Sequence, residues 1–88
     1  MSPELETLDQ LAGGDLSLAV IQELFPDLQA FEKGVLRMLQ SGDVRMLQLD
    51  GKAVEEWRWK EYLGEHSSEY DPAQLKLSLT TIGAGKIT

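Results

Sequence analysis

The sequence predicts an α+β domain in which three N-terminal helices are followed by a small antiparallel sheet. Apolar residues in the N-terminal half recur at spacings of three and four, which is the period of one helix face. Gly42 follows the last of these positions, and residues 44–49 are rich in apolar side chains typical of a strand. Leu75, Leu77 and Leu79 then alternate with polar residues, as in a strand with one buried face. We therefore expect helices first, strands later, and a single small domain over residues 1–88.

The length and composition limit how this domain can be stabilised. Its 88 residues are near the lower size at which one apolar core is sufficient. No cysteine is present, so neither a disulfide nor a thiolate metal site can supplement the core. No apolar run approaches the roughly 20 residues of a membrane span. The N-terminus also lacks the basic and apolar blocks of a secretory signal, so we expect a cytoplasmic protein that does not bind membranes.

Two helices are expected before residue 27. The first begins after Ser2, whose hydroxyl can cap the free amides, and ends at Gly13. The second is short, begins at Asp15 or Ser17, and must stop before Pro26 because proline cannot continue a helix. The helically spaced apolar residues of the first helix are Leu5, Leu8, Leu11 and Ala12, and those of the second are Leu18, Ile21, Leu24 and Phe25.

The third helix is predicted to run over residues 28–41, with Asp27 as its cap and Gly42 as its terminator. Gly34 lies inside it at a cost of about 1 kcal/mol relative to alanine. We expect a close approach of another backbone there, although a small residue on the surface is the alternative. The positions expected to face inward are Leu28, Phe31, Val35, Met38 and Leu39.

After the strand at residues 44–49, Asp50-Gly51 predicts a type I′ hairpin turn, with positive φ at both positions; an ordinary loop is the alternative. We expect a short return strand at residues 52–54 and a helix over residues 55–63. The alternation of Trp57 and Trp59 also leaves a strand possible there. In a helix the two indoles are separated by about 200°, so one of them would be exposed. The glycine-rich C-terminal tail, IGAGKIT, is expected to fray at its end.

Two segments resemble the winged-helix family. The run VLRMLQSGDVRML at residues 35–47 resembles the end of a winged-helix third helix entering its first wing strand. The segment LTTIGAGKI at residues 79–87 is similar to the final wing strand and following turn of several bacterial regulators. The resemblance covers residues 15–87 and implies a winged-helix-like fold. Two departures are that the third helix contains Glu32 among its polar positions and that residues 57–72 lengthen the wing.

The net charge of −7 argues against a general affinity for nucleic acid, because such affinity comes mostly from neutralised phosphates. The charge is unevenly distributed. Residues 1–27 contain six acids and no lysine or arginine, whereas residues 28–60 contain six bases and five acids.

No pattern in the sequence predicts catalysis. The single histidine, His66, lies in a polar stretch and is expected to be a solvated loop residue. The GAGK at residues 83–86 lacks the spacing of a phosphate-binding loop. A metal site formed by Glu65, His66, Glu69 and Asp71 is conceivable, but these residues match no established ligand spacing. We therefore expect no enzymatic activity, no metal and no cofactor.

The main functional hypothesis is a protein-interaction or regulatory module. Trp57, Trp59 and Tyr62, interleaved with Arg58 and Lys60, are the residue types that dominate interface hot spots. The competing interpretation is that such aromatics fill the core of a small domain. A protein partner or a second copy would contact the predicted surface formed by Arg37, Arg45, Trp57, Arg58 and Trp59.

Two alternatives remain. A dimeric DNA-binding regulator would place the third helix in the major groove, as the winged-helix resemblance implies, although the net charge opposes it. Its candidate DNA-contacting residues are Gln29, Lys33, Arg37, Gln40, Arg45 and Lys52, with Arg58 as a further phosphate contact. An acidic inhibitor that mimics nucleic acid would use Glu4, Glu6, Asp9, Asp15, Glu23 and Asp27.

Overall fold

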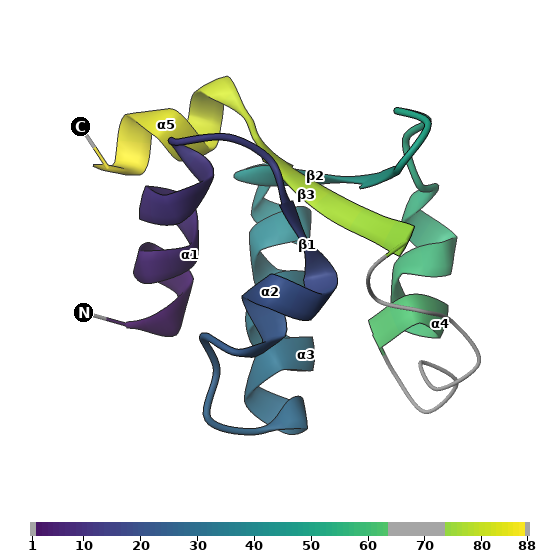
Figure 1. Cartoon of the computed structure of the whole chain (residues 1–88), viewed down its shortest axis with the longest axis horizontal. Coiled ribbons are helices and arrows are strands. Elements are labelled where there is room, and N and C mark those ends of the chain that lie inside the picture. Colours follow the sequence, from purple (N-terminus) through teal and green to yellow (C-terminus); the bar gives the residue numbers. More distant parts are fainter. Residues whose placement is uncertain (1, 64–73, 88) are drawn as a thin grey trace.

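The computed structural model of the chain describes residues 2–63 and 74–87 (Figure 1). The described helices are α1 (Pro3–Leu11), α2 (Leu18–Gln22), α3 (Leu28–Ser41), α4 (Trp59–Leu63) and α5 (Thr81–Ile87), with a 3-10 helix, η1, at Glu56–Arg58. The strands are β1 (Leu16–Ser17), β2 (Val44–Gln48) and β3 (Leu75–Leu79). The predicted α+β class, with three helices ahead of the antiparallel pair β2–β3, is confirmed.

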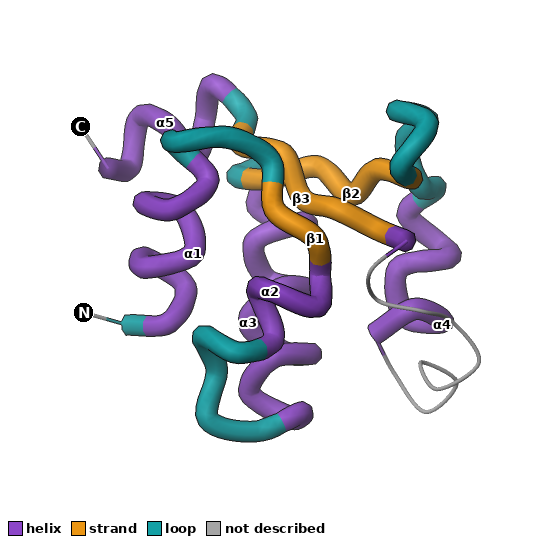
Figure 2. The backbone as a smooth tube through the Cα atoms, viewed as in Figure 1, coloured by secondary structure: helices purple, strands orange, loops and turns teal. Residues whose placement is uncertain are grey.

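The three strands form one antiparallel sheet in the order β1-β3-β2. Leu77, in the middle of β3, lies opposite Leu16 of β1 and Met46 of β2. In Figure 2 the strands cross above α2 and α3. Leu77 and Met46 are 0% and 1% exposed, so the inner face of the sheet is closed by the helices. Strand β1 was not predicted, because a strand of two residues is too short to show an alternation of apolar and polar side chains.

Local capping explains where the first three helices begin. Ser2, Ser17 and Asp27 each accept a hydrogen bond from a backbone amide three residues further on. Of the two caps predicted for α2, the structure uses Ser17. The other, Asp15, forms an ion pair with Lys76 of β3 at 3.3 Å and so ties the loop before β1 to the sheet.

The core contains most of the residues expected to face inward, with one exception. Leu28 is 62% exposed, so its predicted inward position was wrong. It is the first residue of α3, at the end of the helix furthest from the sheet in Figure 1, where the helix extends past its neighbours. The buried apolar residues are Leu8, Leu11, Leu18, Ile21, Phe25, Phe31, Val35, Met38, Leu39, Val44, Met46, Val54, Tyr62, Leu63, Leu75 and Leu77.

Gly34 is buried because the ring of Phe25 packs directly over it. A Cβ at this position would lie 2.5 Å from Cε1 of that ring. The expected close approach is therefore present, but its source is a side chain and not a backbone. The Phe25 ring is positioned edge-on against Phe31, with ring centroids 5.9 Å apart.

Replacing Gly34 with alanine is expected to lower the free energy of unfolding by about 1 kcal/mol, although alanine is the better helix former. The new methyl group forces the Phe25 ring out of its contact with Phe31. Urea unfolding followed by circular dichroism measures the change. A variant as stable as the parent chain would show that the ring moves without cost.

The turn after β2 differs from the predicted type I′ turn. Gly51 has a φ of 92°, but Asp50 does not have a positive φ, and type I′ requires both. Instead, the Gly51 amide donates to the Gln48 carbonyl at 2.9 Å, and the Gln48 amide donates to the Lys52 carbonyl at 2.8 Å. This is the pattern of a three-residue hairpin loop with a left-handed glycine. The Asp50 carboxylate accepts from the Lys52 amide at 3.0 Å, which stabilises the turn locally.

The predicted return strand at residues 52–54 is reduced to one bridge. Ala53 pairs with Leu47, and the Val54 amide donates to the Met46 carbonyl at 2.8 Å. The helix predicted over residues 55–63 is present as η1 followed by α4. The chain leaves the sheet after Val54 because that side chain turns into the core, where it is 7% exposed.

The C-terminal segment forms helix α5 and not the turn that the winged-helix resemblance implied. The end of the tail, where fraying was predicted, lies outside the described residues. The Thr80 hydroxyl caps α5 by accepting from the Gly83 amide at 3.1 Å. The same hydroxyl lies 2.5 and 2.8 Å from the carbonyl oxygens of Gly42 and Asp43. These contacts fix the start of α5 to the junction of α3 and β2. The glycines of α5 make a helix intrinsically weak, so its stability depends on this tertiary contact.

Candidate interaction site

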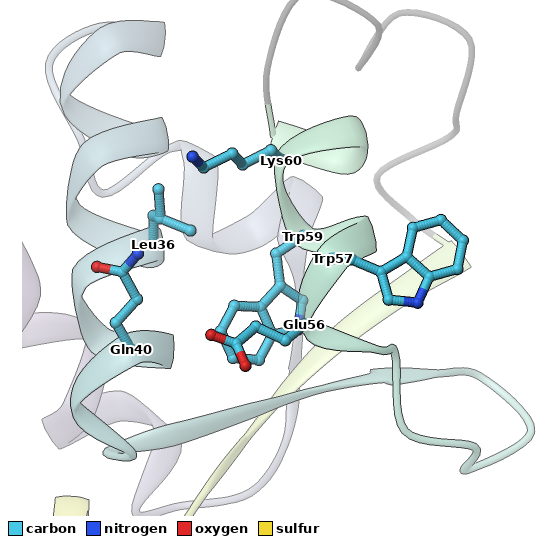
Figure 3. Close-up of a pocket in the computed structure, with 6 residues that line it drawn as sticks. All are labelled: Leu36, Gln40, Glu56, Trp57, Trp59 and Lys60. Atoms are coloured by element: carbon cyan, nitrogen blue, oxygen red, sulfur yellow. The ribbon is translucent and has the colours of Figure 1, made fainter.

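An open groove of about 480 Å³ lies on the surface between α3 and the η1–α4 segment (Figure 3). Leu36 and Gln40 point into it from α3, and Lys60 extends toward Leu36 from α4. Its lining residues are Leu36, Gln40, Glu56, Trp57, Trp59 and Lys60. Leu36 and Trp59 form the apolar floor of this groove, and Gln40, Glu56 and Lys60 give it a polar and charged rim.

Trp59 forms part of the floor. It is half-buried and packs against the core. Its indole N–H donates to the carbonyl of Val54 at 3.2 Å, which joins α4 to the segment that pairs with β2. Trp59 thus has a structural function as well as a place in the groove.

Trp57 is the most exposed large apolar side chain in the described ranges, at 68%. In Figure 3 its ring points away from the groove that Trp59 lines. The indole N–H of Trp57 donates to the Glu55 carboxylate. The Arg58 guanidinium lies 5.8 Å from the Trp57 ring centroid and 5.3 Å from that of Tyr62. Each such cation–π contact at an exposed site contributes about 0.5–1 kcal/mol, so the exposed indole has a defined orientation.

These two environments confirm the helical interpretation of the tryptophans. One indole is exposed and the other is half-buried, as their separation around a helix predicts. The 3-10 turn at η1 adjoining α4 produces this difference.

The predicted partner-binding residues do not form one continuous surface. Trp57, Arg58 and Trp59 are brought together by η1 and the start of α4. Arg37 instead pairs with Glu4 of α1 at 3.3 Å, and in Figure 1 α1 and α4 lie on opposite sides of α3. Arg45 is the exposed residue between the buried Val44 and Met46, so it lies on the outer face of β2.

The residues predicted to contact DNA are exposed but have different surroundings. Gln29 and Lys33 lie on the outer surface of α3, and Lys52 lies in the turn after β2. Gln40 and Glu56 both line the groove, and Arg37 is paired with Glu4. A carboxylate therefore lies near each side of the exposed α3 surface, Glu4 on one side and Glu56 on the other.

Several of the N-terminal acids make contacts within the molecule. Glu4 and Asp15 are in ion pairs, and Asp27 caps α3. Glu6 and Glu23 contribute negative charge to the α1 and α2 region. The internal contacts reduce the number of carboxylates that could imitate the phosphates of a nucleic acid.

A polar cluster that the sequence did not predict joins α5 to the end of α3. The Asp43 side chain is 5% exposed, and its Oδ2 lies 2.7 Å from Nζ of Lys86. Its Oδ1 is buried and has no hydrogen-bond partner within the described ranges. A single aspartate after a glycine gives no signal for such burial, because the lysine lies far along the chain.

The described residues were also compared with what a metal site and a membrane-spanning helix require. Within residues 2–63 and 74–87, no group of three or more histidine, cysteine, aspartate or glutamate side chains could hold a metal ion. Glu65, His66, Glu69 and Asp71 lie outside those ranges. None of the helices described is both long and apolar enough to cross a membrane.

The sequence assigned the tryptophans to a binding surface, but it assigned Gln40 only to DNA contact and did not single out Leu36. Leu36 and Gln40 are four residues apart, which places them on one helix face, and this spacing was the available signal. It could not indicate which element would lie opposite.

No protein family, curated protein or solved structure matches the chain.

Proposed function

We propose that this chain is a non-enzymatic protein-interaction module on a winged-helix-like scaffold, whose binding surface is Trp57, Arg58 and the α3–α4 groove. The observation that supports this most strongly is Trp57, which is 68% exposed yet oriented by Glu55 and Arg58. Ordering a side chain on binding costs about 0.5–1.5 kcal/mol, and an indole already oriented avoids part of that cost. Tryptophan and arginine are also the residue types enriched in interface hot spots.

The order of the elements supports the scaffold part of the proposal. Helix α3 ends at Gly42, β2 begins at Val44, and β3 returns antiparallel to β2. This is the arrangement that the winged-helix resemblance implies. The segment between β2 and β3 contains η1 and α4, and α4 packs against α3. In this chain the wing position thus contributes one wall of the groove.

Protein binding is favoured over DNA binding because of what surrounds α3. A major groove of DNA is about 12 Å wide and admits a helix when that helix is accessible along its outer face. Here α4 lies along part of α3, and Glu56 and Glu4 lie near its flanks. Placing these carboxylates beside phosphates would be unfavourable. Lys33 and Gln29 are exposed on α3 and remain accessible to DNA.

Photo-crosslinking tests the proposed surface. A photoreactive side chain at Lys60, which is exposed on the groove, is expected to give one defined protein adduct in the native cell. The same group at Gln10, exposed on α1, serves as the matched control and should not give that adduct. Trp57→Ala should reduce the Lys60 adduct about tenfold if the indole is a hot spot. Equal adducts from both positions, or no adduct from Lys60, would contradict the proposal.

A titration with random DNA duplex at low salt distinguishes the proposed protein-interaction module from the alternative of a DNA-binding regulator. Electrostatic binding is strongest under these conditions, so a DNA-binding protein should show it clearly. We expect no change in the amide resonances of α3. Shifts concentrated at Gln29 and Lys33 would favour the DNA-binding regulator instead.

A further inference from the structure

The exposed Trp57 and the α3–α4 groove lie next to each other on one side of the molecule. In Figure 3 the Trp57 ring points away from the floor formed by Leu36 and Trp59, so it does not fill the groove of its own chain. The molecule therefore presents an unfilled groove with an apolar floor and, on its rim, an exposed aromatic side chain.

The groove is large enough to admit an indole ring. Its volume of about 480 Å³ falls within the range of roughly 300–1,000 Å³ that is typical of small-molecule pockets. Leu36 and Trp59 provide apolar and aromatic contacts. An indole entering from outside would meet an aromatic ring, and such aromatic pairs contribute about 0.5–1.5 kcal/mol beyond area burial.

The charges near the two features can pair with each other. Arg58 and Glu55 accompany the Trp57 indole, and Glu56 and Lys60 line the groove. A molecule bearing Glu55, Trp57 and Arg58 would bring one charge of each sign to a groove that also has one of each sign. This chain itself is such a molecule.

We infer that two copies of this chain associate about a two-fold axis, with Trp57 of each copy seated in the α3–α4 groove of the other. The inference rests on the proposed function and specifies the partner. A two-fold interface uses the same patch on both subunits, so the patch must be self-complementary. A projecting indole adjacent to a groove that accepts it meets this condition. The net charge of −7 on each copy opposes association, so we expect a reversible dimer whose population depends on concentration.

Sedimentation velocity over a range of protein concentrations tests the dimer with two variants of the full chain. Trp57→Ala removes the projecting indole but leaves the groove. Gln40→Arg obstructs the groove from an exposed position but leaves the indole, and it does not disturb the core. Each variant alone is expected to dimerise with a Kd raised about tenfold or more. Ile82→Ala, at an exposed site on α5, is the matched control and should dimerise like the parent chain.

An equimolar mixture of the two variants provides the decisive measurement. A heterodimer of Trp57→Ala with Gln40→Arg contains one intact pair, the Trp57 of the second in the groove of the first. The mixture should therefore dimerise more strongly than either variant alone. A general loss of folding cannot produce this recovery.

Three outcomes would overturn the inference: a monomer at every concentration, variants that dimerise like the parent chain, or a mixture without recovery. A monomeric chain whose Lys60 adduct contains a different protein would overturn self-association and leave the interaction function in place. A monomer that also gives no Lys60 adduct would contradict both.

Discussion

Replacing Gly83 with alanine is expected to lower the free energy of unfolding by about 3 kcal/mol and to detach α5 from the domain. A Cβ on Gly83 would overlap the backbone carbonyl oxygen of Asp43 and also crowd the Leu79 side chain. The carbonyl cannot move freely, because it accepts hydrogen bonds from both the amide and the hydroxyl of Thr80. Urea unfolding measures the loss, and hydrogen exchange of the α5 amides shows whether the helix opens locally.

Gly85→Ala is the matched control in the same helix. A Cβ at Gly85 would meet no atom within 4 Å. Since alanine is the better helix former, this variant should gain a few tenths to about 1 kcal/mol. Equal effects at Gly83 and Gly85 would show that helix propensity, and not contact with Asp43, determines the stability of α5.

Replacing Lys86 with methionine is expected to cost about 2 kcal/mol. The change removes the ammonium that lies 2.7 Å from Oδ2 of Asp43 and leaves a carboxylate that is 5% exposed without its partner. The Oδ1 atom already has no hydrogen-bond partner in the described part of the chain, so no second contact compensates. Leaving a buried polar group unsatisfied costs about 1–3 kcal/mol, and more for a charge. Thermal and urea unfolding measure the loss.

Two comparisons distinguish the loss of this ion pair from a general effect of losing a lysine. One is a control variant at an exposed lysine, and the other is a double-mutant cycle. Lys33→Met, at an exposed site on α3, should change stability by less than about 0.5 kcal/mol. Asp43→Asn combined with Lys86→Met should cost less than the sum of the two single changes. Additive costs would mean that the two side chains do not interact in solution.

Both predictions concern the end of the molecule away from the proposed binding surface. In Figure 1 α5 lies beside α1, whereas α4 lies across α3 from them. The groove depends instead on Trp59, whose indole N–H donates to Val54, and on the bond from the Val54 amide to Met46 of β2. A moderate loss of stability at α5 should therefore leave the groove intact, as long as the domain remains folded.

The candidate site was partly predictable. Trp57 and Arg58 were assigned to a binding surface because aromatic and cationic residues interleave within a few positions, and helical geometry required the two tryptophans to differ in exposure. Arg37 was assigned to the same surface, yet its partner is Glu4 of α1. The α3 wall of the groove was missed because a helix face does not specify which element packs beside it.

The sequence by itself determined the features that depend on neighbouring residues. Ser2, Ser17 and Asp27 cap helices through amides three residues away, and Gly42 ends α3 with a φ of 83°. The alternation at β3 likewise specifies which of its faces is buried. Each of these effects acts within one turn of helix or a few strand positions, so a short window of sequence contains the whole cause.

Only the tertiary structure decided the remaining elements. Strand β1 has two residues and exists because Leu16 pairs with Leu77. Helix α5 contains Gly83 and Gly85 and is stabilised by Thr80 and Asp43. The groove needs α4 to lie against α3. In each case the stabilising partner is distant along the chain, and local propensity is too weak to choose a structure until folding brings that partner into contact.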